Sequence, residues 1–252
     1  DLMGNVFRYQ TLDSTNTAAI SMAKEGQTEA VVVAQRQTGG KGRMGRHFVS
    51  PEGGLYLSYL TSGLAPGDAV LALAPAVALA VRRAIRAVYG LDCRIKYPND
   101  LLLQDRKVCG ILTEMAVEGE TGALQYLLTG IGVNANHAPE DFSPEVRDIA
   151  VSLAQVLGRP VDRGRLCACL INALDAMYAR WLAGDTAWRQ RYRDGCLTLG
   201  RPVRLLRGDR PEEAFAEDLD PDLGLIVRHS DGRRETVTAG EVSVRRLFGY
   251  SD

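Results

Sequence analysis

A short segment rich in glycine and basic residues offers the clearest chemistry in this sequence. Within residues 37–46, Lys41, Arg43 and Arg46 alternate with glycines. Glycine lets the backbone come close to a ligand, and closely spaced cations add charge-assisted hydrogen bonds. The spacing fits neither a P-loop nor a Gly-x-Gly-x-x-Gly fingerprint, and no aromatics are interleaved as in a nucleic-acid patch. The segment predicts a loop that binds a polyanion such as a triphosphate, although a solvated basic loop explains the composition equally well.

Two further segments place polar side chains at the ends of apolar strands. Pro98 favours an extended turn, after which Asn99 and Asp100 can point into a cleft. Lys107 leads an otherwise apolar strand, with Gly110 close behind it. Taken singly, a Pro-Asn-Asp turn and a lysine at the start of a strand are ordinary surface features.

The segment 130–136 combines two glycines with two asparagines. Gly130 and Gly132 interrupt a strand, which indicates that a ligand or another backbone comes close to them. A β-bulge would account for the same two glycines.

The overall composition narrows the class of protein. Lys plus Arg number 30 and Asp plus Glu 31, so the net charge of -1 gives no reason to expect a nucleic-acid partner. The cysteines are odd in number and lack Cys-x-x-Cys spacing, which favours reduced thiols in a cytoplasmic protein. The N-terminus lacks a signal pattern, and the apolar run 69–81 is shorter than the roughly 20 residues of a membrane span. We expect no membrane association.

The periodicity of the apolar residues predicts an α+β fold. Helices are expected at 15–25, 68–89, 151–157 and 164–182, and strands at 6–12, 30–35, 55–61, 94–96, 101–103, 107–117 and 124–133. A hairpin turn at 119–122 would join the last two strands, and the segment 138–150 would be irregular. Beyond Gly200, short strands between Gly, Asp and Pro turns predict a small β-barrel or sandwich. The chain therefore divides into domains 1–198 and 199–252.

In their order and spacing, these segments resemble the biotin–protein ligase family over about residues 6–248. The resemblance rests on Ser14-Thr15-Asn16, Gln37 with the loop 40–46, the segment 96–101 followed by Lys107, the segment 130–134, and the C-terminal segment 240–245. Two positions depart from the family pattern. Lys41 replaces the usual arginine and cannot form the bidentate hydrogen bonds of a guanidinium group, and Tyr97 stands where tryptophan is common.

The resemblance implies a fold and a reaction. The fold would be a mixed or antiparallel sheet flanked by helices, like the catalytic domain of class II aminoacyl-tRNA synthetases, followed by an SH3-like β-barrel. The carboxylate of biotin would attack the α-phosphate of ATP, with Mg²⁺ present, to give biotinyl-5′-AMP and pyrophosphate. A lysine amine of a biotin carboxyl carrier protein would then accept biotin. Because the first step brings two anions together, it needs a cluster of fixed positive charge.

The resemblance also assigns roles to residues. Lys107 and Arg43 are the expected catalytic residues, with Lys107 beside the biotin carboxylate and the α-phosphate. The expected biotin-binding residues are Ser14, Thr15, Asn16, Gln37, Lys41, Gly42, Arg43 and Lys107. The expected ATP-binding residues are Gly40, Arg43, Arg46, Asn99, Asp100 and Asn134. No strong metal motif occurs, but Asp100 could contact Mg²⁺, and the glycine-rich loop would fold over the intermediate and shield it from water.

Other functions stay open at this point. A lipoate–protein ligase or octanoyl transferase shares the architecture, but the polar residues 14–16 favour biotin, whose ureido ring needs more hydrogen bonding. A biotin-binding module without turnover would bind biotin and leave ATP intact. A biotin-responsive repressor would carry an N-terminal helix-turn-helix domain. Because the first strand is predicted close to the start of the sequence, we expect the single-function form, as a monomer or a homodimer.

Overall fold

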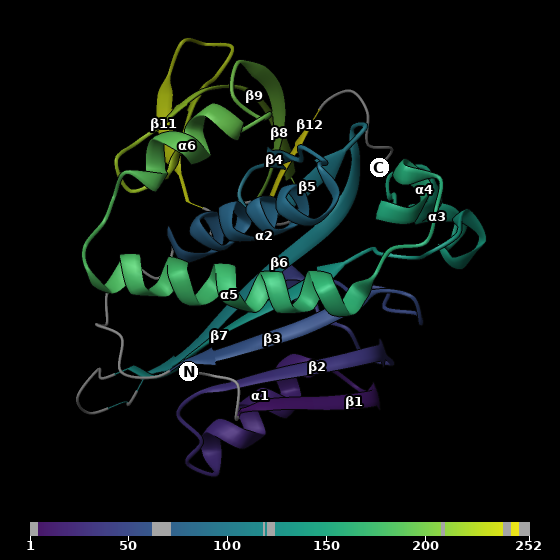
Figure 1. The fold of residues 1–252 in the computed structure, drawn as a ribbon. Helices are drawn as coiled ribbons and strands as arrows, with labels where there is room; N and C mark the ends of the chain where they lie inside the picture. Colours follow the sequence, from purple (N-terminus) through teal and green to yellow (C-terminus); the bar gives the residue numbers. More distant parts are fainter. Residues whose placement is uncertain are drawn as a thin grey trace.

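The main body of the protein is a seven-stranded mixed sheet (Figure 1). The computed structural model describes residues 5–61, 72–117, 119, 124–207, 210–238 and 243–246. The strands are β1 (Val6–Leu12), β2 (Ala30–Gln37), β3 (Leu55–Thr61), β4 (Arg94–Lys96), β5 (Asp100–Leu103), β6 (Arg106–Val117) and β7 (Leu124–Val133), in the order β1-β2-β3-β7-β6-β5-β4. Only β1 and β2 pair in parallel; the other neighbours in this sheet are antiparallel.

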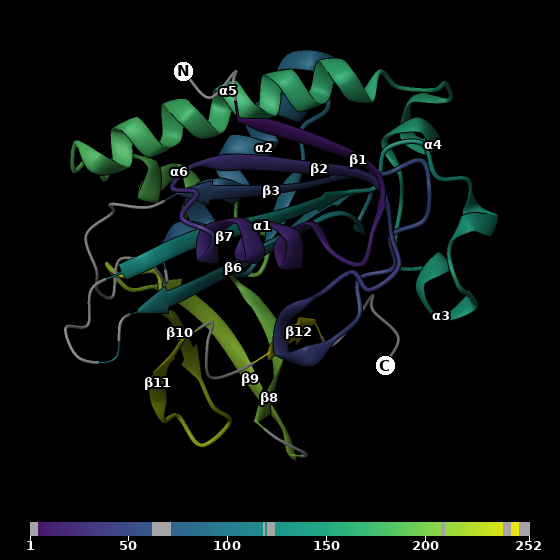
Figure 2. The same ribbon diagram turned by 90° about the horizontal axis from the view of Figure 1, so that it is seen from below.

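Helices cover both faces of this sheet (Figure 2). Helix α1 (Thr15–Lys24) lies on one face, while α2 (Leu73–Tyr89) and α5 (Arg163–Leu182) pack together on the other. Strand β2 contributes apolar side chains to both faces of the sheet. Ala30 and Val32 pack towards α1, and Val31 joins the larger core on the opposite face. This period of two is that of a strand buried on both faces. The predicted α+β class is confirmed.

A separate antiparallel sheet follows the main body. It consists of β8 (Arg201–Arg207), β9 (Arg210–Leu219), β10 (Leu225–Arg228), β11 (Arg234–Val237) and β12 (Ser243–Arg246), in the order β11-β10-β9-β8-β12. The expected strand-rich C-terminal region is therefore present, although residues 240–242 of its expected closing motif lie outside the described part. Tyr192 Oη donates to Pro98 O at 2.7 Å and Leu197 N donates to Ile95 O at 2.7 Å, which ties the junction to the main sheet.

The structure differs from the sequence prediction in several helical segments. Helix α3 (Pro144–Arg147) forms within the segment expected to be irregular, because proline at a first helical position is pre-organised for a helix. Helix α4 (Leu153–Leu157) starts after Ser152, whose hydroxyl accepts from Gln155 N at 3.2 Å. Pro75 lies in the first turn of α2, and α6 (Trp188–Gly195) had not been predicted. Residues 68–71 and most of the expected turn at 119–122 lie outside the described residues. Within those described, no helix has the length and apolar character needed to cross a bilayer.

Candidate active site

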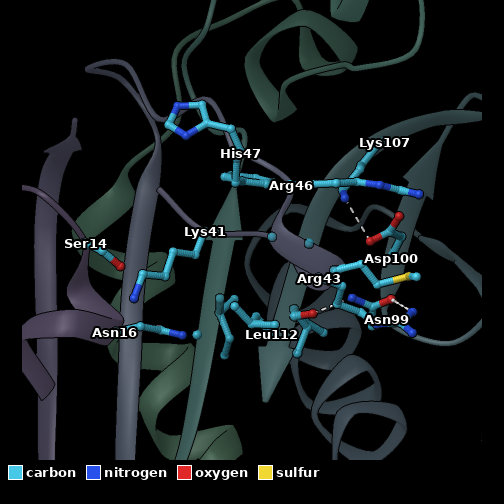
Figure 3. Close-up of a pocket in the computed structure, with 18 of the residues that line it drawn as sticks. Ser14, Asn16, Lys41, Arg43, Arg46, His47, Asn99, Asp100, Lys107 and Leu112 are labelled. Carbon is cyan, nitrogen blue, oxygen red and sulfur yellow. Dashed lines mark hydrogen bonds and ion pairs between the residues drawn. The ribbon is translucent and has the colours of Figure 1, made fainter. Parts of the chain in front are cut away.

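A cavity of about 300 Å³ lies between the start of α1, the loop 41–48 and strands β5 to β7 (Figure 3). The residues expected to bind ligands were spread over more than a hundred positions of the sequence, and the fold brings most of them together here. Those that line the cavity are Ser14, Thr15, Asn16, Gln37, Lys41, Gly42, Arg43, Arg46, Asn99, Asp100 and Lys107. Gly40 and Asn134 are not among the lining residues.

One end of the cavity consists of buried, neutral hydrogen-bonding groups. Ser14, Thr15 and Asn16 at the start of α1 are 2%, 3% and 4% exposed. Gln37, at the end of β2, accepts at Oε1 from Thr15 N at 2.8 Å, and its Nε2 donates to Ser50 Oγ at 2.9 Å. These bonds fix the orientation of the Gln37 amide, since a backbone N–H can only donate.

The glycines of β7 form the floor of the cavity. Pairing is regular from Gly130 to Val133, so these glycines do not mark a β-bulge. Instead, two side chains lie against them. A Cβ at position 130 would collide with the Asn16 amide, and a Cβ at position 132 would lie 2.5 Å from the Phe48 ring. What comes close is therefore neither a second backbone nor a bulge, but the polar and aromatic walls of the cavity.

The other end of the cavity is cationic. Lys107 Nζ lies 2.9 Å from Asp100 Oδ1 and 5.5 Å from the centre of the Phe48 ring. Arg43 Nη1 donates to Asn99 Oδ1 at 3.3 Å, while the Asn99 amide nitrogen donates to Ile111 O. Burial lowers the pKa of the Arg43 guanidinium, and the neighbouring Asp100 carboxylate opposes this shift. A partly desolvated cation of this kind interacts strongly with an anion in the cavity.

The backbone of Lys107 is held on both sides. Its N–H donates to Ile149 O at 2.7 Å, and its carbonyl accepts from Val151 N at 2.9 Å. The same carbonyl accepts from Asn134 Nδ2 at 3.1 Å. Asn134 thus lies behind Lys107, where it positions the strand, and does not itself line the cavity.

The basic loop forms a hydrogen-bonded turn over the cavity. Phe48 N donates to Gly40 O at 2.8 Å, and Gly42 N donates to Arg46 O at 2.7 Å. Met44 and Gly45 have φ of 56° and 73°, the left-handed conformation that allows the chain to reverse. A side chain at position 40 would meet Phe48 O and Ser50 Oγ, so Gly40 is required for this closure. Gly40 shapes the loop, while Lys41, Arg43 and Arg46 carry its charge into the cavity.

Two family models match the sequence: the Biotin/lipoate A/B protein ligase family over residues 7–134, and the Biotin protein ligase C terminal domain over residues 198–245. A biotin--[acetyl-CoA-carboxylase] ligase of Paracoccus denitrificans is 32% identical over 238 residues, which cover 91% of this chain and 96% of the relative. The chain belongs to the biotin protein ligase family.

Other proteins of the biotin protein ligase family are also similar to this chain, in sequence or in structure. The bifunctional ligase/repressor BirA of Bacillus spizizenii is 33% identical over 243 residues, which cover 95% of this chain and 74% of the relative. A biotin protein ligase from Aquifex aeolicus, solved in complex with biotin and ATP, has a TM-score of 0.80 at 28% identity and covers 96% of this chain. The likeness therefore holds for sequence and fold together.

Three side chains around this biotin protein ligase cavity had not been predicted from the sequence. Phe48 covers the glycine floor, while Ser58 and Glu114 bond to the residues at the neutral end. Ser58 is a polar residue inside the otherwise apolar strand β3 and is 0% exposed, and Glu114 is a charge within the apolar strand β6. A polar side chain within an otherwise apolar strand is the signal that could have identified both.

Proposed function

We propose that this chain is an ATP-dependent biotin–protein ligase, which activates biotin as biotinyl-5′-AMP and transfers it to a lysine of a biotin carboxyl carrier protein. The observation that carries this proposal is one cavity with a neutral, hydrogen-bonding end and a cationic end. Relatives named biotin--[acetyl-CoA-carboxylase] ligase, at 30% and 32% identity, support it, as does the solved neighbour with biotin and ATP.

The two ends suit the two parts of the activation step. The neutral ureido ring of biotin fits the end at Ser14, Thr15, Asn16 and Gln37, which leaves its carboxylate directed towards Lys107. One N–H of the Lys107 ammonium points at Asp100, and two N–H groups are left for the carboxylate and the α-phosphate. Lys107 would offset the repulsion between these anions and the charge that develops in the transition state.

The arginines would hold the phosphates of ATP. Arg43, positioned by Asn99, can form the bidentate hydrogen bonds that phosphates favour. Arg46 adds charge from the same loop, whereas Lys41 is directed towards the neutral end in Figure 3, where biotin would bind. The acceptor lysine brings its own amine, so the protein needs no nucleophile of its own.

The cavity fits a Mg²⁺ ion that arrives with ATP. Asp100 lines the cavity with a carboxylate that is 19% exposed, whereas no cluster of three or more Asp, Glu, His or Cys ligands occurs there among the described residues. Mg²⁺ in nucleotide sites is commonly held by one or two carboxylates together with substrate phosphates and waters. Bound in this way, Mg²⁺ would neutralise phosphate charge, and Asp100 would orient it.

The domain division belongs to the same proposal. Residues 1–198 would form the catalytic domain, like that of class II aminoacyl-tRNA synthetases, and residues 199–252 the SH3-like barrel. Support comes from the separate sheet that starts at Arg201. Tyr97 joins the two parts, since it lines the cavity and its hydroxyl donates to Val237 O at 3.5 Å. The exposed edge of β1 offers a pairing surface if the enzyme is a homodimer.

The proposal is tested by incubating the protein with ATP, Mg²⁺, biotin and a biotin-carrier domain, and probing the carrier with streptavidin. We expect labelling that depends on ATP and on the carrier lysine, and that lipoate does not replace. Biotin binding without labelling would support the alternative of a module without turnover. Efficient transfer of lipoate would instead support a lipoate–protein ligase.

A further inference from the structure

We infer that Ser58 and Glu114 fix the Asn16 amide so that it offers an N–H group, and not its oxygen, to the head group of the ligand. Neither residue lines the cavity, so both would be positioning residues that act through Asn16. The inference rests on the proposed biotin ligase function and names the feature by which the site would recognise a carbonyl-bearing head group.

The contact with Glu114 fixes the direction of the amide. Asn16 Nδ2 donates to Oε2 of Glu114, a residue in the second half of β6. A carboxylate oxygen accepts hydrogen bonds, so the amide nitrogen must face Glu114, and a reversed amide would place two oxygens against each other. Asn16 is 4% exposed, so such a repulsive contact would be costly.

The contact with Ser58 fixes the other side of the same amide. Ser58 Oγ lies 2.6 Å from Asn16 Oδ1 and 2.7 Å from Thr15 Oγ1. The Ser58 hydroxyl has one proton, and the amide oxygen of Asn16 can only accept it, so Ser58 donates to Asn16, while the Thr15 hydroxyl donates to Gln37 Oε1 at 3.0 Å. A Cβ at position 130 would overlap the Asn16 amide, which shows that the amide lies directly against β7.

This bonding leaves one specific group for a ligand. Both Oδ1 and one N–H of the Asn16 amide are satisfied by Ser58 and Glu114, and the second N–H remains on a residue that lines the cavity. A ureido carbonyl can accept it, whereas a dithiolane ring offers no such acceptor. Sites built around a buried donor discriminate strongly against ligands that leave it unpaired.

The test compares biotin with 2-iminobiotin, whose guanidinium head group can only donate, in biotin-dependent pyrophosphate exchange. Glu114→Met and Ser58→Ala should each raise KM for biotin roughly tenfold. They should leave kcat and KM for ATP within about twofold and reduce the preference for biotin over 2-iminobiotin by roughly the same factor. Glu114→Gln, which keeps an acceptor oxygen, should restore most of the preference.

A second measurement uses the wild-type protein, so that it does not depend on the folding of variants. With uniform ¹⁵N labelling, one of the two Asn16 side-chain amide protons should shift on addition of biotin, while the partner proton bonded to Glu114 stays in place. Unchanged preference in both variants, or an Asn16 amide that does not respond to biotin, would overturn the inference. Wild-type protein without biotin-dependent exchange would overturn the proposed function itself.

Discussion

The two ends of the cavity are organised in opposite ways. At the neutral end, Asn16 and Ser58 are 4% and 0% exposed, and their polar atoms already bond to one another. At the cationic end, the side chains of Lys107 and Asp100 are 28% and 19% exposed and keep contact with water. The neutral end is therefore pre-organised for a ligand, whereas the cationic end would exchange water for phosphate in the proposed reaction. Substitutions at the first should act on binding, and substitutions at the second on chemistry.

The largest effect is expected from Lys107→Ala. Removal of the cation proposed to lie beside the reacting anions should lower biotin-dependent pyrophosphate exchange on the order of 100- to 1,000-fold, with a melting temperature close to that of the wild type. Lys24→Ala, at the exposed end of α1, is the matched control and should leave exchange unchanged. Near-wild-type exchange in Lys107→Ala would remove Lys107 from the reaction.

Gly130→Ala should affect binding at the opposite end. A methyl group there would displace the Asn16 amide, so KM for biotin should rise by at least about tenfold, with a much smaller change in kcat. Gly119→Ala is the control, because a Cβ at that glycine meets nothing within 4 Å. Equal KM values for the two variants would contradict the close packing of Asn16 on β7.

Arg43→Gly should weaken the hold on the intermediate. Biotinyl-5′-AMP should dissociate roughly tenfold faster from this variant, because the proposed phosphate contact and the bond to Asn99 are both lost. Arg43→Lys keeps the positive charge but cannot form two parallel hydrogen bonds to a phosphate. Its rate of release should therefore lie between those of the wild type and Arg43→Gly. Release measured by rapid filtration separates these cases, and unchanged release from Arg43→Gly would exclude the loop as a cover.

The smallest effect on catalysis is expected from Asn134→Ala. Loss of its bond to Lys107 O should lower the free energy of unfolding by about 1–3 kcal/mol, while exchange falls only a few-fold. Asn136→Ala, which loses bonds to both backbone groups of Val161, is the matched control for stability alone. If Asn134→Ala raised KM for ATP strongly and left stability intact, Asn134 would contact the nucleotide directly.

The sequence predicted most of the sheet because its signals are local. Alternating or continuous apolar runs marked β1, β3 and β7 with the bounds that the structure shows. Helix α6 was not predicted, since Arg189, Arg191 and Arg193 give it a polar surface and Tyr192 alone is fully buried among its side chains. Trp188 and Tyr192, four residues apart, are the only large apolar side chains of this helix, and one such pair is too short a pattern to show a period of 3.6 residues.

The residues of the candidate site were predicted from the family resemblance, while the separate role of each residue depends on contacts between positions far apart in the sequence. Gly40 and Asn134 lie in the segments identified from the sequence, yet they support Phe48 and Lys107 from outside the cavity. Glu114 meets Asn16 across 98 positions of the chain. Such a contact follows from the register of β6 against β7 and from the placement of α1 on the sheet, neither of which a linear pattern specifies.

The most direct test of the account is a crystal structure of this protein with a non-hydrolysable analogue of biotinyl-5′-AMP. We predict that the ureido carbonyl accepts a hydrogen bond from Asn16 Nδ2, and that the phosphate lies within hydrogen-bond reach of Lys107 and Arg43. A ligand bound in the reverse direction, or a phosphate outside the cavity between these two side chains, would contradict the assignment of a neutral binding end and a cationic reacting end.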